Sequence, residues 1–322
     1  MSKQRPTSTS QVLAALLAGT ALLAACGAAS GPLGSVPVPS ASAEPSVAQG
    51  SPDVTPAPSV DASDEPSSEP SGSTGAPSPS ASASADAGTM VVRAYFWLDG
   101  PVGSRGLVAV LRTVPATKAV ATAAINALLD GPTTAEKARG ISSQMPDGTQ
   151  LLGLTINNDS ATIDLSSEFQ SGGGGDAYQT RIAQVVYTLT QFPSVKAIGL
   201  EIEGTGDAMA LDRGAYVDLL PAIWVDRPAW NAAIGNPAHV TGSADVFEAT
   251  FRVSILDGSG KVIADQQVMA TCGTGCRGTF DTSVPYTIGK AQYGTLRVYE
   301  PSAKDGSPQN VRDYRVWLTP KS

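Results

Sequence analysis

The side chains that could do chemistry in this sequence are few and scattered. Glu201 and Glu203 alternate along an expected strand and would share a face, which suits acid–base chemistry, a bound cation or a plain solvated surface. Asp164 ends another expected strand, where we expect it to organise the following turn. His239 is the sole histidine and fits a surface or edge position. Because no Gly-x-Ser-x-Gly, His-Glu-x-x-His or P-loop motif occurs, no catalytic residue is predicted.

Two further groups could hold a ligand. Glycines 172–175 precede an expected helix, whose N-terminus could cradle an anion; without a lysine or threonine among them, they equally fit a simple linker. Five aromatic residues could line a glycan-binding groove or pack in the core and between domains. No cofactor and no metal ion are expected. The five aromatic residues are Tyr95, Phe96, Trp97, Trp224 and Trp230.

The N-terminus has the features of an export signal. Lys3 and Arg5 precede an apolar run over residues 12–25, which is too short and too alanine-rich for a membrane span and is typical of a signal peptide. The run ends in Leu-Ala-Ala-Cys-Gly at residues 23–27, which resembles the bacterial lipobox. This resemblance implies cleavage between Ala25 and Cys26 and diacylglycerol on Cys26. More than one acyl chain makes membrane attachment stable.

The chain has three cysteines, and lipidation of Cys26 leaves Cys272 and Cys276. Outside the cytoplasm a disulfide between these two is the expected state. Glycines 273 and 275 make so tight a loop possible. The alternatives are a redox pair or half of a metal site, although His239 lies in a different segment.

Charge is distributed unevenly along the chain. The net charge of −8 divides into +2 for residues 1–25, −7 for residues 27–88 and −3 for residues 89–322. No basic stripe exists that would bind nucleic acid. Residues 26–88 are rich in serine, proline, alanine and glycine, which predicts a disordered tether. As a flexible coil it would span about 40–50 Å.

Strands and helices alternate over residues 89–226, which predicts a compact α/β sandwich. Thr117 is the expected N-cap of the first helix, and Gly131-Pro132 is expected to stop it. The expected strands cover 91–97, 106–111, 151–156, 161–165 and 197–203, and the second helix covers 176–191.

Several short motifs in this segment, taken in order, resemble the GerMN domain. That family occurs in sporulation and spore-germination proteins and in actinobacterial envelope lipoproteins, and the resemblance implies an extracytoplasmic, non-catalytic domain. The motifs are Tyr95-Phe96, Leu-Leu-Asp-Gly-Pro at 128–132, Met-Pro-Asp-Gly-Thr at 145–149, Ala-Thr-Ile-Asp-Leu-Ser at 161–166, and Thr-Leu-Thr-Gln-Phe-Pro-Ser-Val at 188–195.

The remaining segment, 227–322, loses the helical period and predicts a β-sandwich. Residues 245–257 alternate in polarity and predict one half-buried strand that includes Phe247, with a turn at Asp257-Gly258. Further strands are expected at 261–270, 279–281, 295–300 and 311–319. Motifs at 236–237, 240–242, 245–249, 294–300 and 302–307 resemble the Gmad-type immunoglobulin-like domain of spore-germination proteins. The fold class is therefore α+β, with an α/β sandwich followed by an immunoglobulin-like sandwich.

These features together predict a non-enzymatic lipoprotein on the outer face of the cell membrane. We expect it to bind an envelope protein or peptidoglycan in envelope assembly or signalling. One rival is a hydrolase or transferase that acts on wall polymer through Asp164 or Glu201. Another is a sensor of a small molecule for a membrane receptor.

Overall fold

The computed structural model describes residues 88–206 and 210–321. The predicted signal peptide, Ala25, Cys26 and nearly all of the tether lie outside these residues. Within the described ranges, no helix has the length and apolar character needed to cross a membrane.

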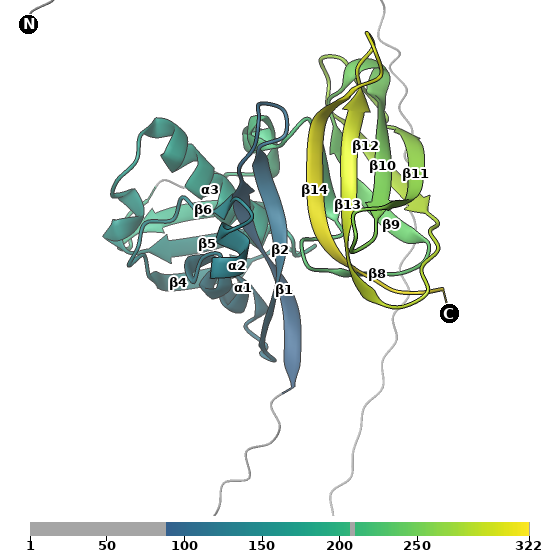
Figure 1. The fold of residues 1–322 in the computed structure, drawn as a ribbon. Coiled ribbons are helices and arrows are strands. Elements are labelled where there is room, and N and C mark those ends of the chain that lie inside the picture. The colour runs from purple at the N-terminus through teal and green to yellow at the C-terminus, as the bar shows by residue number, and fades with distance from the viewer. Residues whose placement is uncertain (1–87, 207–209, 322) are drawn as a thin grey trace, which may run out of the picture. The chain divides into compact units, whose positions relative to one another are not determined.

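The first sheet is built on a long hairpin (Figure 1). Strand β1, Thr89–Leu98, pairs with β2, Gly106–Pro115, in antiparallel register from Thr89↔Pro115 to Leu98↔Gly106. The short strand β3, Ile141–Ser142, extends the sheet beside residues 97–98. Both long strands were predicted in place, and β2 runs further than expected.

A second sheet has the order β4-β5-β6, and two helices contact both sheets. Its strands are β4 (Leu151–Asn157), β5 (Ser160–Leu165) and β6 (Ala197–Ile202); β5 and β6 are parallel. The helices are α1 (Val120–Leu129) and α3 (Gly175–Leu189). Several of the apolar positions that predicted these helices are fully buried, among them Ala124, Leu128, Val185 and Val186. The interleaved α/β fold of this segment is therefore confirmed.

Two details of the helices differ from expectation. Ala119, and not Thr117, is the N-cap of α1, and the Thr117 hydroxyl instead accepts a hydrogen bond from the Ala119 amide at 3.1 Å. The short helix α2, Thr134–Lys137, was missed although Thr133 and Glu136 form a capping box. Glu136 is buried because it also binds the Arg112 guanidinium through two hydrogen bonds of 2.8 and 2.7 Å.

Helix α3 closes the edge of β1 that β3 leaves open. The Gln184 amide donates to the Tyr95 carbonyl at 2.9 Å, and the Thr188 hydroxyl accepts from the Tyr95 amide at 3.1 Å. Gln191 bonds both the amide and the carbonyl of Arg93. Gln184 and Thr188 lie on one face of α3 and are buried, and together with Gln191, which follows the helix, they substitute for a neighbouring strand.

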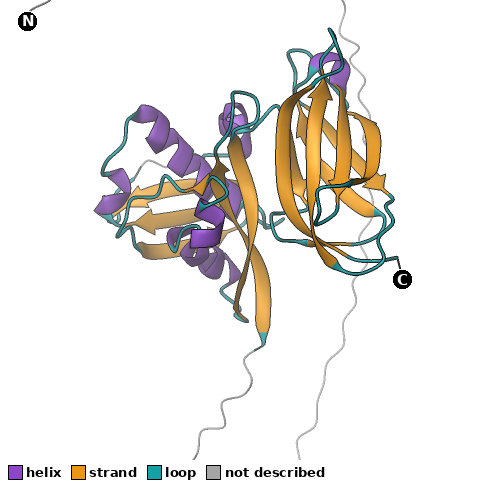
Figure 2. Cartoon of the chain, in the orientation of Figure 1, coloured by secondary structure: helices purple, strands orange, loops and turns teal. Residues whose placement is uncertain are grey.

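The second half of the described chain is all β (Figure 2). One sheet has the order β11-β10-β13-β14-β8 and the other β12-β9-β7. Phe251 and Phe280 pack edge to face between them, with ring centroids 4.8 Å apart. The strands are β7 (Ile223–Arg227), β8 (Ala233–Ile234), β9 (Ala238–Ala244), β10 (Thr250–Leu256), β11 (Val262–Met269), β12 (Gly278–Val284), β13 (Gln292–Pro301) and β14 (Pro308–Leu318). The expected β-sandwich is confirmed.

The prediction of a single strand over residues 245–257 was wrong for residues 245–249, because β10 begins only at Thr250. Residues 247–249 form a one-turn 3-10 helix, η3, and Glu248 and Ala249 have φ of 53° and 57°. Phe247 is therefore 55 % exposed and not part of the inward stripe. The apolar alternation is real only from Phe251 onward, where the strand pairs with β11 and β13.

Arg312 of β14 joins the sandwich to the β1–β2 hairpin. Its guanidinium donates to the carbonyl oxygens of Ser104, Gly106 and Leu107 at 2.6, 3.2 and 2.8 Å. Arg312 is 2 % exposed, and burial lowers the pKa of its guanidinium. One continuous hydrophobic cluster also runs from the first sheet into the sandwich. The two predicted domains therefore share a packed junction.

Candidate binding cleft

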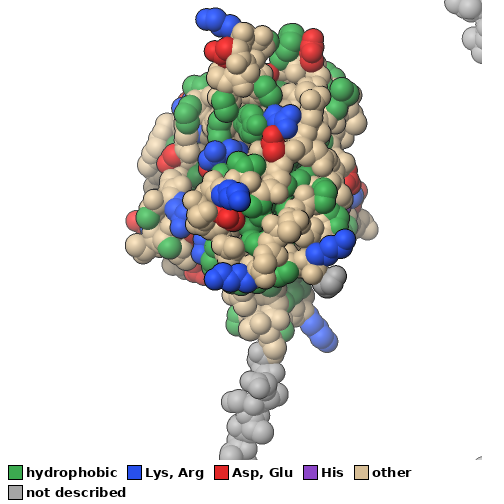
Figure 3. Space-filling view, turned by 45° about the vertical axis from the view of Figure 1, so that its right-hand side comes forward, with side chains coloured by type: hydrophobic (Ala, Val, Ile, Leu, Met, Phe, Trp, Pro, Cys, Tyr) green, Lys and Arg blue, Asp and Glu red, His purple; other side chains and the backbone are tan. Residues whose placement is uncertain are grey.

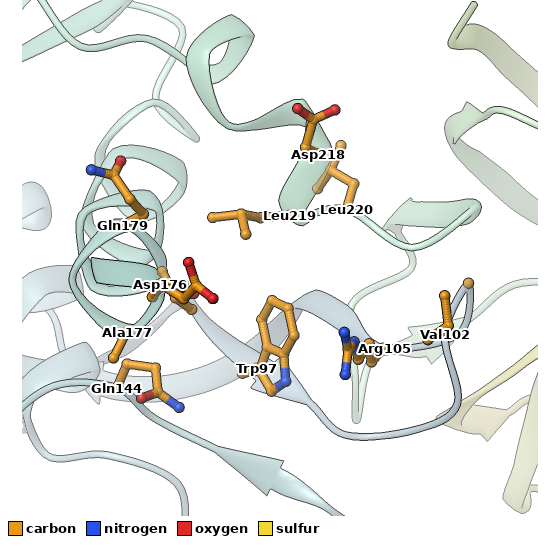
Figure 4. Close-up of a pocket in the computed structure, with 12 residues that line it drawn as sticks. Trp97, Val102, Arg105, Gln144, Asp176, Ala177, Gln179, Asp218, Leu219 and Leu220 are labelled. Atoms are coloured by element: carbon orange, nitrogen blue, oxygen red, sulfur yellow. Dashed lines mark hydrogen bonds between the residues drawn. The ribbon is translucent and has the colours of Figure 1, made fainter. Parts of the chain in front are cut away.

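A cleft of about 710 Å³ lies beside Trp97 (Figure 4). Its walls come from the end of β1, the turn between β1 and β2, the first turns of α3, and the 3-10 helix η2, Arg213–Leu219. In Figure 4 the Trp97 indole stands between Asp176 and Arg105, and Asp218 lies above them. A pocket of this size with an aromatic wall and a few polar groups is typical of ligand sites.

The polar side chains around Trp97 are not engaged with one another. Among residues 88–206 and 210–321, the cleft-lining side chains of Arg105, Asp176, Asp218, Gln144 and Gln179 make no hydrogen bond or salt bridge. Their donors and acceptors are therefore available to a ligand.

The walls of the cleft are held in place by close backbone packing. Gly106 has φ of 147°, and a Cβ at this position would lie 2.7 Å from the Leu219 carbonyl oxygen and 2.8 Å from Pro221 Cδ. Only glycine lets the hairpin approach η2 so closely. The Ala222 amide also donates to the Gly103 carbonyl at 2.8 Å. Trp97 and Arg105 on the hairpin thus keep a fixed position relative to Asp218.

A cluster of aromatic rings around one arginine lies behind the cleft. The Arg213 guanidinium carbon stands 4.7 Å from the ring centre of Tyr187, 5.6 Å from that of Tyr95 and 6.0 Å from that of Trp224. Asp226 accepts from the Tyr95 hydroxyl at 2.7 Å and from Arg93 at 3.0 Å. Burial, and then the Asp226 charge, raise the pKa of Tyr95, and burial raises the pKa of Tyr187 to about 12.

These raised pKa values predict a loss of stability in alkaline solution. A tyrosine whose pKa is higher in the folded state than its unfolded value of about 10 stabilises the fold below that value and loses this contribution as the pH rises. We expect Tyr187→Phe to reduce the destabilisation between pH 10 and 11.5 by about 1.5 kcal/mol. Urea unfolding at both pH values measures it. Tyr293→Phe, at a position 44 % exposed, is the control; equal pH profiles for all three proteins would contradict the assignment.

A second hollow, of about 660 Å³, lies on the outer face of the β12-β9-β7 sheet. Its lining includes Trp224, Thr241, Thr279 and Asp281. His239 stands on the same face and bonds Asp281 at 2.6 Å, with 62 % of its own side chain exposed. The surface position expected for His239 thus agrees with its place on this strand.

The predicted carboxylates are brought together only in part. Asp164 of β5 lies directly beside Glu201 of β6 in the parallel register. Glu203 lies beyond β6 with φ of 51° and accepts from the Ser167 amide at 3.3 Å, so it does not share the strand face of Glu201 as expected. Asp164 accepts from the Gly204 amide at 3.0 Å, which places its role in the turn after β6. Neither Asp164 nor Glu201 lines either of the two hollows described above.

The glycine run at 172–175 surrounds a cation and not an anion. The Arg181 guanidinium donates to the carbonyl oxygens of Phe169, Ser171 and Gly172, the last two at 3.0 Å. Gly172 and Gly173 have φ of 63° and 73°. The loop therefore turns its carbonyls inward toward Arg181, which is opposite to what an anion site requires.

Cys272 and Cys276 form a disulfide in the structure, with Cα atoms 5.9 Å apart. The loop they close packs on η3: Thr274 donates its amide to the Val246 carbonyl at 3.0 Å, and its hydroxyl accepts from the Glu248 amide at 3.1 Å. No group of three or more metal-ligating side chains occurs among the described residues. The cysteine pair thus lies where it supports the turn that displays Phe247.

For the disulfide, intact-mass measurement of the purified protein provides the check. Without reductant the mass is expected to be lower than the reduced mass by the mass of two hydrogen atoms. Cys276→Ser should abolish the difference. A wild-type mass that is unchanged by reductant would contradict the bond.

The five aromatic candidates divide between core and cleft. Tyr95 and Phe96 are fully buried, and Trp224 and Trp230 are 6 % and 5 % exposed. Trp97 alone of the five lines the cleft. The charged residues beside it were not among the predicted site residues, because Arg105, Asp176 and Asp218 stand far apart in sequence and belong to no motif. The Asp99-Gly100 turn motif predicted the β1–β2 hairpin, but it did not predict that this hairpin borders a cleft with α3 and η2.

Family models match both halves of the described chain. Residues 94–207 match Germane, the sporulation and spore germination family. Residues 222–307 match Gmad2, the immunoglobulin-like domain of bacterial spore germination. The second match begins just before β7, which pairs with β9, although we expected the second domain to begin at residue 227. A search of curated proteins gave no match.

Solved structures give similar neighbours. The first GerMN domain of the sporulation protein GerM of Bacillus subtilis shares 23% identity over 39% of this chain and 98% of its own, with a TM-score of 0.32. The tandem GerMN domains of that protein share 15% identity over 62% of each chain, with a TM-score of 0.32. A candidate lipoprotein of Clostridium perfringens shares 20% identity over 41% of this chain and 93% of its own, with a TM-score of 0.29. On the two family models, the chain combines a GerMN domain with a Gmad-type immunoglobulin-like domain.

Proposed function

We propose that the protein is a lipid-anchored binding protein of the cell envelope, held on the outer face of the membrane through Cys26. The observation that carries the proposal is the Trp97 cleft, which presents five polar side chains beside an aromatic ring, none of them hydrogen-bonded or ion-paired within the part of the chain that the structure describes. The junction through Arg312 adds to it, because GerMN and immunoglobulin-like domains joined by buried hydrogen bonds present one preformed surface. The two families are those of spore germination and sporulation proteins, which supports a role in envelope assembly or signalling.

The surface charge fits an envelope protein or wall polymer as partner better than nucleic acid. In Figure 3, basic and acidic side chains are interspersed over the visible face and form no large basic area. Nucleic-acid binding needs such an area against the phosphates.

The function is tested by retention. The full chain in detergent is incubated with insoluble peptidoglycan and, separately, with an envelope extract, and we expect retention by at least one. Trp97→Ala should lower retention at least about tenfold, by loss of the ring contact. Trp317→Ala is the control, because that tryptophan packs on Tyr293 in the sandwich, away from the cleft. Retention by neither material would contradict the proposed binding function. The anchor is tested separately: Cys26→Ser, which removes the lipidated cysteine, should release the protein from cells.

A second candidate function rests on the adjacency of Asp164 and Glu201 across β5 and β6. Two neighbouring carboxylates could serve as acid and base toward a wall polymer. Incubation of the protein with purified wall material decides the matter. Turnover that is lost in Asp164→Asn or Glu201→Gln would replace the binding function with a hydrolase or transferase.

A further inference from the structure

The charges of the Trp97 cleft are divided between its two sides. Asp176 belongs to the first turn of α3 and Asp218 to η2, whereas Arg105 belongs to the turn between β1 and β2. Figure 4 shows Asp176 and Arg105 on opposite sides of the Trp97 indole, with Asp218 on the wall above. A ligand that crosses the indole therefore meets the Asp176 carboxylate at one end and the Arg105 guanidinium at the other, with the Asp218 carboxylate on the wall above.

Each end selects a charged group by its geometry. A guanidinium has a planar fork of N–H donors that matches a carboxylate through two parallel hydrogen bonds. A carboxylate with free acceptor oxygens suits an ammonium group, which has three N–H donors. The face of a tryptophan also attracts the positive charge of that group. Both ends are unpaired within the described residues, so binding requires no internal ion pair to be broken.

The middle of the cleft is apolar. The Trp97 ring lies between the two charged ends, and Leu219 and Val102 line the same space. Val102 is 81 % exposed, which leaves apolar surface that a small apolar side chain would cover. The volume of about 710 Å³ is within the range of sites for small ligands.

We propose that the cleft binds a short peptide with a free ammonium and a free carboxylate terminus, its ammonium at Asp176 and its carboxylate at Arg105. An apolar side chain of the peptide packs on Trp97 and Leu219. This assignment rests on the proposed binding function and names the ligand class of the same cleft. A neutral glycan would use the indole and the amides of Gln144 and Gln179 but would leave the three charges unused.

The test uses the dipeptide alanyl-leucine and two blocked forms of it. Isothermal titration calorimetry of the full chain in detergent should show binding of alanyl-leucine. Binding of the N-acetylated dipeptide and of the dipeptide amide should be weaker by about tenfold each, because each has lost one charged hydrogen-bonded end. The Trp97 indole N–H resonance, assigned with Trp97→Phe, should shift on titration.

Variants of the cleft should show which end binds which group. Arg105→Gln should weaken the free dipeptide and the N-acetylated form about equally, but the amide little, because the amide already lacks the carboxylate. Asp176→Asn should weaken the free dipeptide and the amide and spare the N-acetylated form. Arg139→Gln, an exposed arginine outside the cleft, is the matched control and should change nothing. Thermal melting of each variant shows whether it is folded.

Three results would overturn the ligand assignment. One is equal affinity for the free and blocked dipeptides. Another is a shift of the Trp97 resonance by tetra-N-acetylchitotetraose that the two charge variants of the cleft do not alter, which would make the ligand a neutral glycan. The last is no binding of alanyl-leucine by a chain that is retained by peptidoglycan or envelope extract, which rejects this ligand and leaves the proposed function standing. A chain that binds the dipeptide but is retained by neither material would leave the ligand assignment standing and reject the proposed function.

Discussion

Replacing Arg312 with leucine is expected to lower the free energy of unfolding by about 3–5 kcal/mol. The guanidinium is the hydrogen-bond donor to the carbonyls of Ser104, Gly106 and Leu107, and the site is closed to water. Leucine fills part of the volume but removes the buried donor of these three hydrogen bonds, and an unsatisfied buried acceptor costs more than a hydrogen bond contributes. Urea unfolding followed by tryptophan fluorescence measures the change.

The matched control is Arg297→Leu in the same sheet. Arg297 pairs with Asp313 at 2.7 Å, but its side chain is 38 % exposed, so water replaces the lost partner. The expected change is about 0–1 kcal/mol. If Arg312→Leu were no more destabilising than Arg297→Leu, the junction would not depend on this buried arginine.

Replacing Asp226 with alanine should lower the free energy of unfolding by about 2–4 kcal/mol. One carboxylate oxygen accepts from both the Tyr95 hydroxyl and the Arg93 guanidinium. Tyr95 is fully buried and Arg93 is 9 % exposed, so neither donor can turn to bulk water. The effect is measured by the same urea unfolding.

Two further variants test the charge of Asp226 and provide an exposed control. Asp226→Asn keeps an acceptor oxygen without the charge and should lie between wild type and Asp226→Ala. Asp281→Ala removes a carboxylate from the same sheet whose side chain is 72 % exposed, and it should cost less than about 1 kcal/mol. A loss for Asp226→Ala as small as that for Asp281→Ala would mean that the hydrogen bonds from Tyr95 and Arg93 to Asp226 do not stabilise the fold.

The elements of the fold were predictable wherever one local pattern decided them. The apolar spacing over Ile182, Val185, Val186 and Leu189 predicted α3, and those residues are buried. The prediction failed at residues 245–249, where alternation of apolar residues was present without a strand. The disulfide loop and Glu300, which accepts from the Phe247 amide at 2.9 Å, hold this turn, and both lie far away in sequence.

The candidate site was much less predictable than the fold. Trp97 was identified as one of five aromatic residues, but nothing local distinguishes it from Tyr95, two residues earlier on the same strand. Its exposure depends on η2 and α3, which border the cleft on one side and leave the ring uncovered. The partners Arg105, Asp176 and Asp218 come from three elements and meet only after these have packed.

The sequence by itself therefore determined the class of this protein: the order of strands and helices, the two domain families and the cysteine pair. The order of strands and helices follows from short-range patterns, because polarity periods and turn residues act within a few positions along the chain. The two families were identified by the resemblance of short motifs, and the cysteine pair by assigning Cys26 to the lipobox. Only the tertiary structure decided that Arg312 closes the junction and that two carboxylates and a guanidinium flank Trp97. Those arrangements depend on close packing between distant segments, such as Gly106 against Leu219, and no local pattern records which segments will meet.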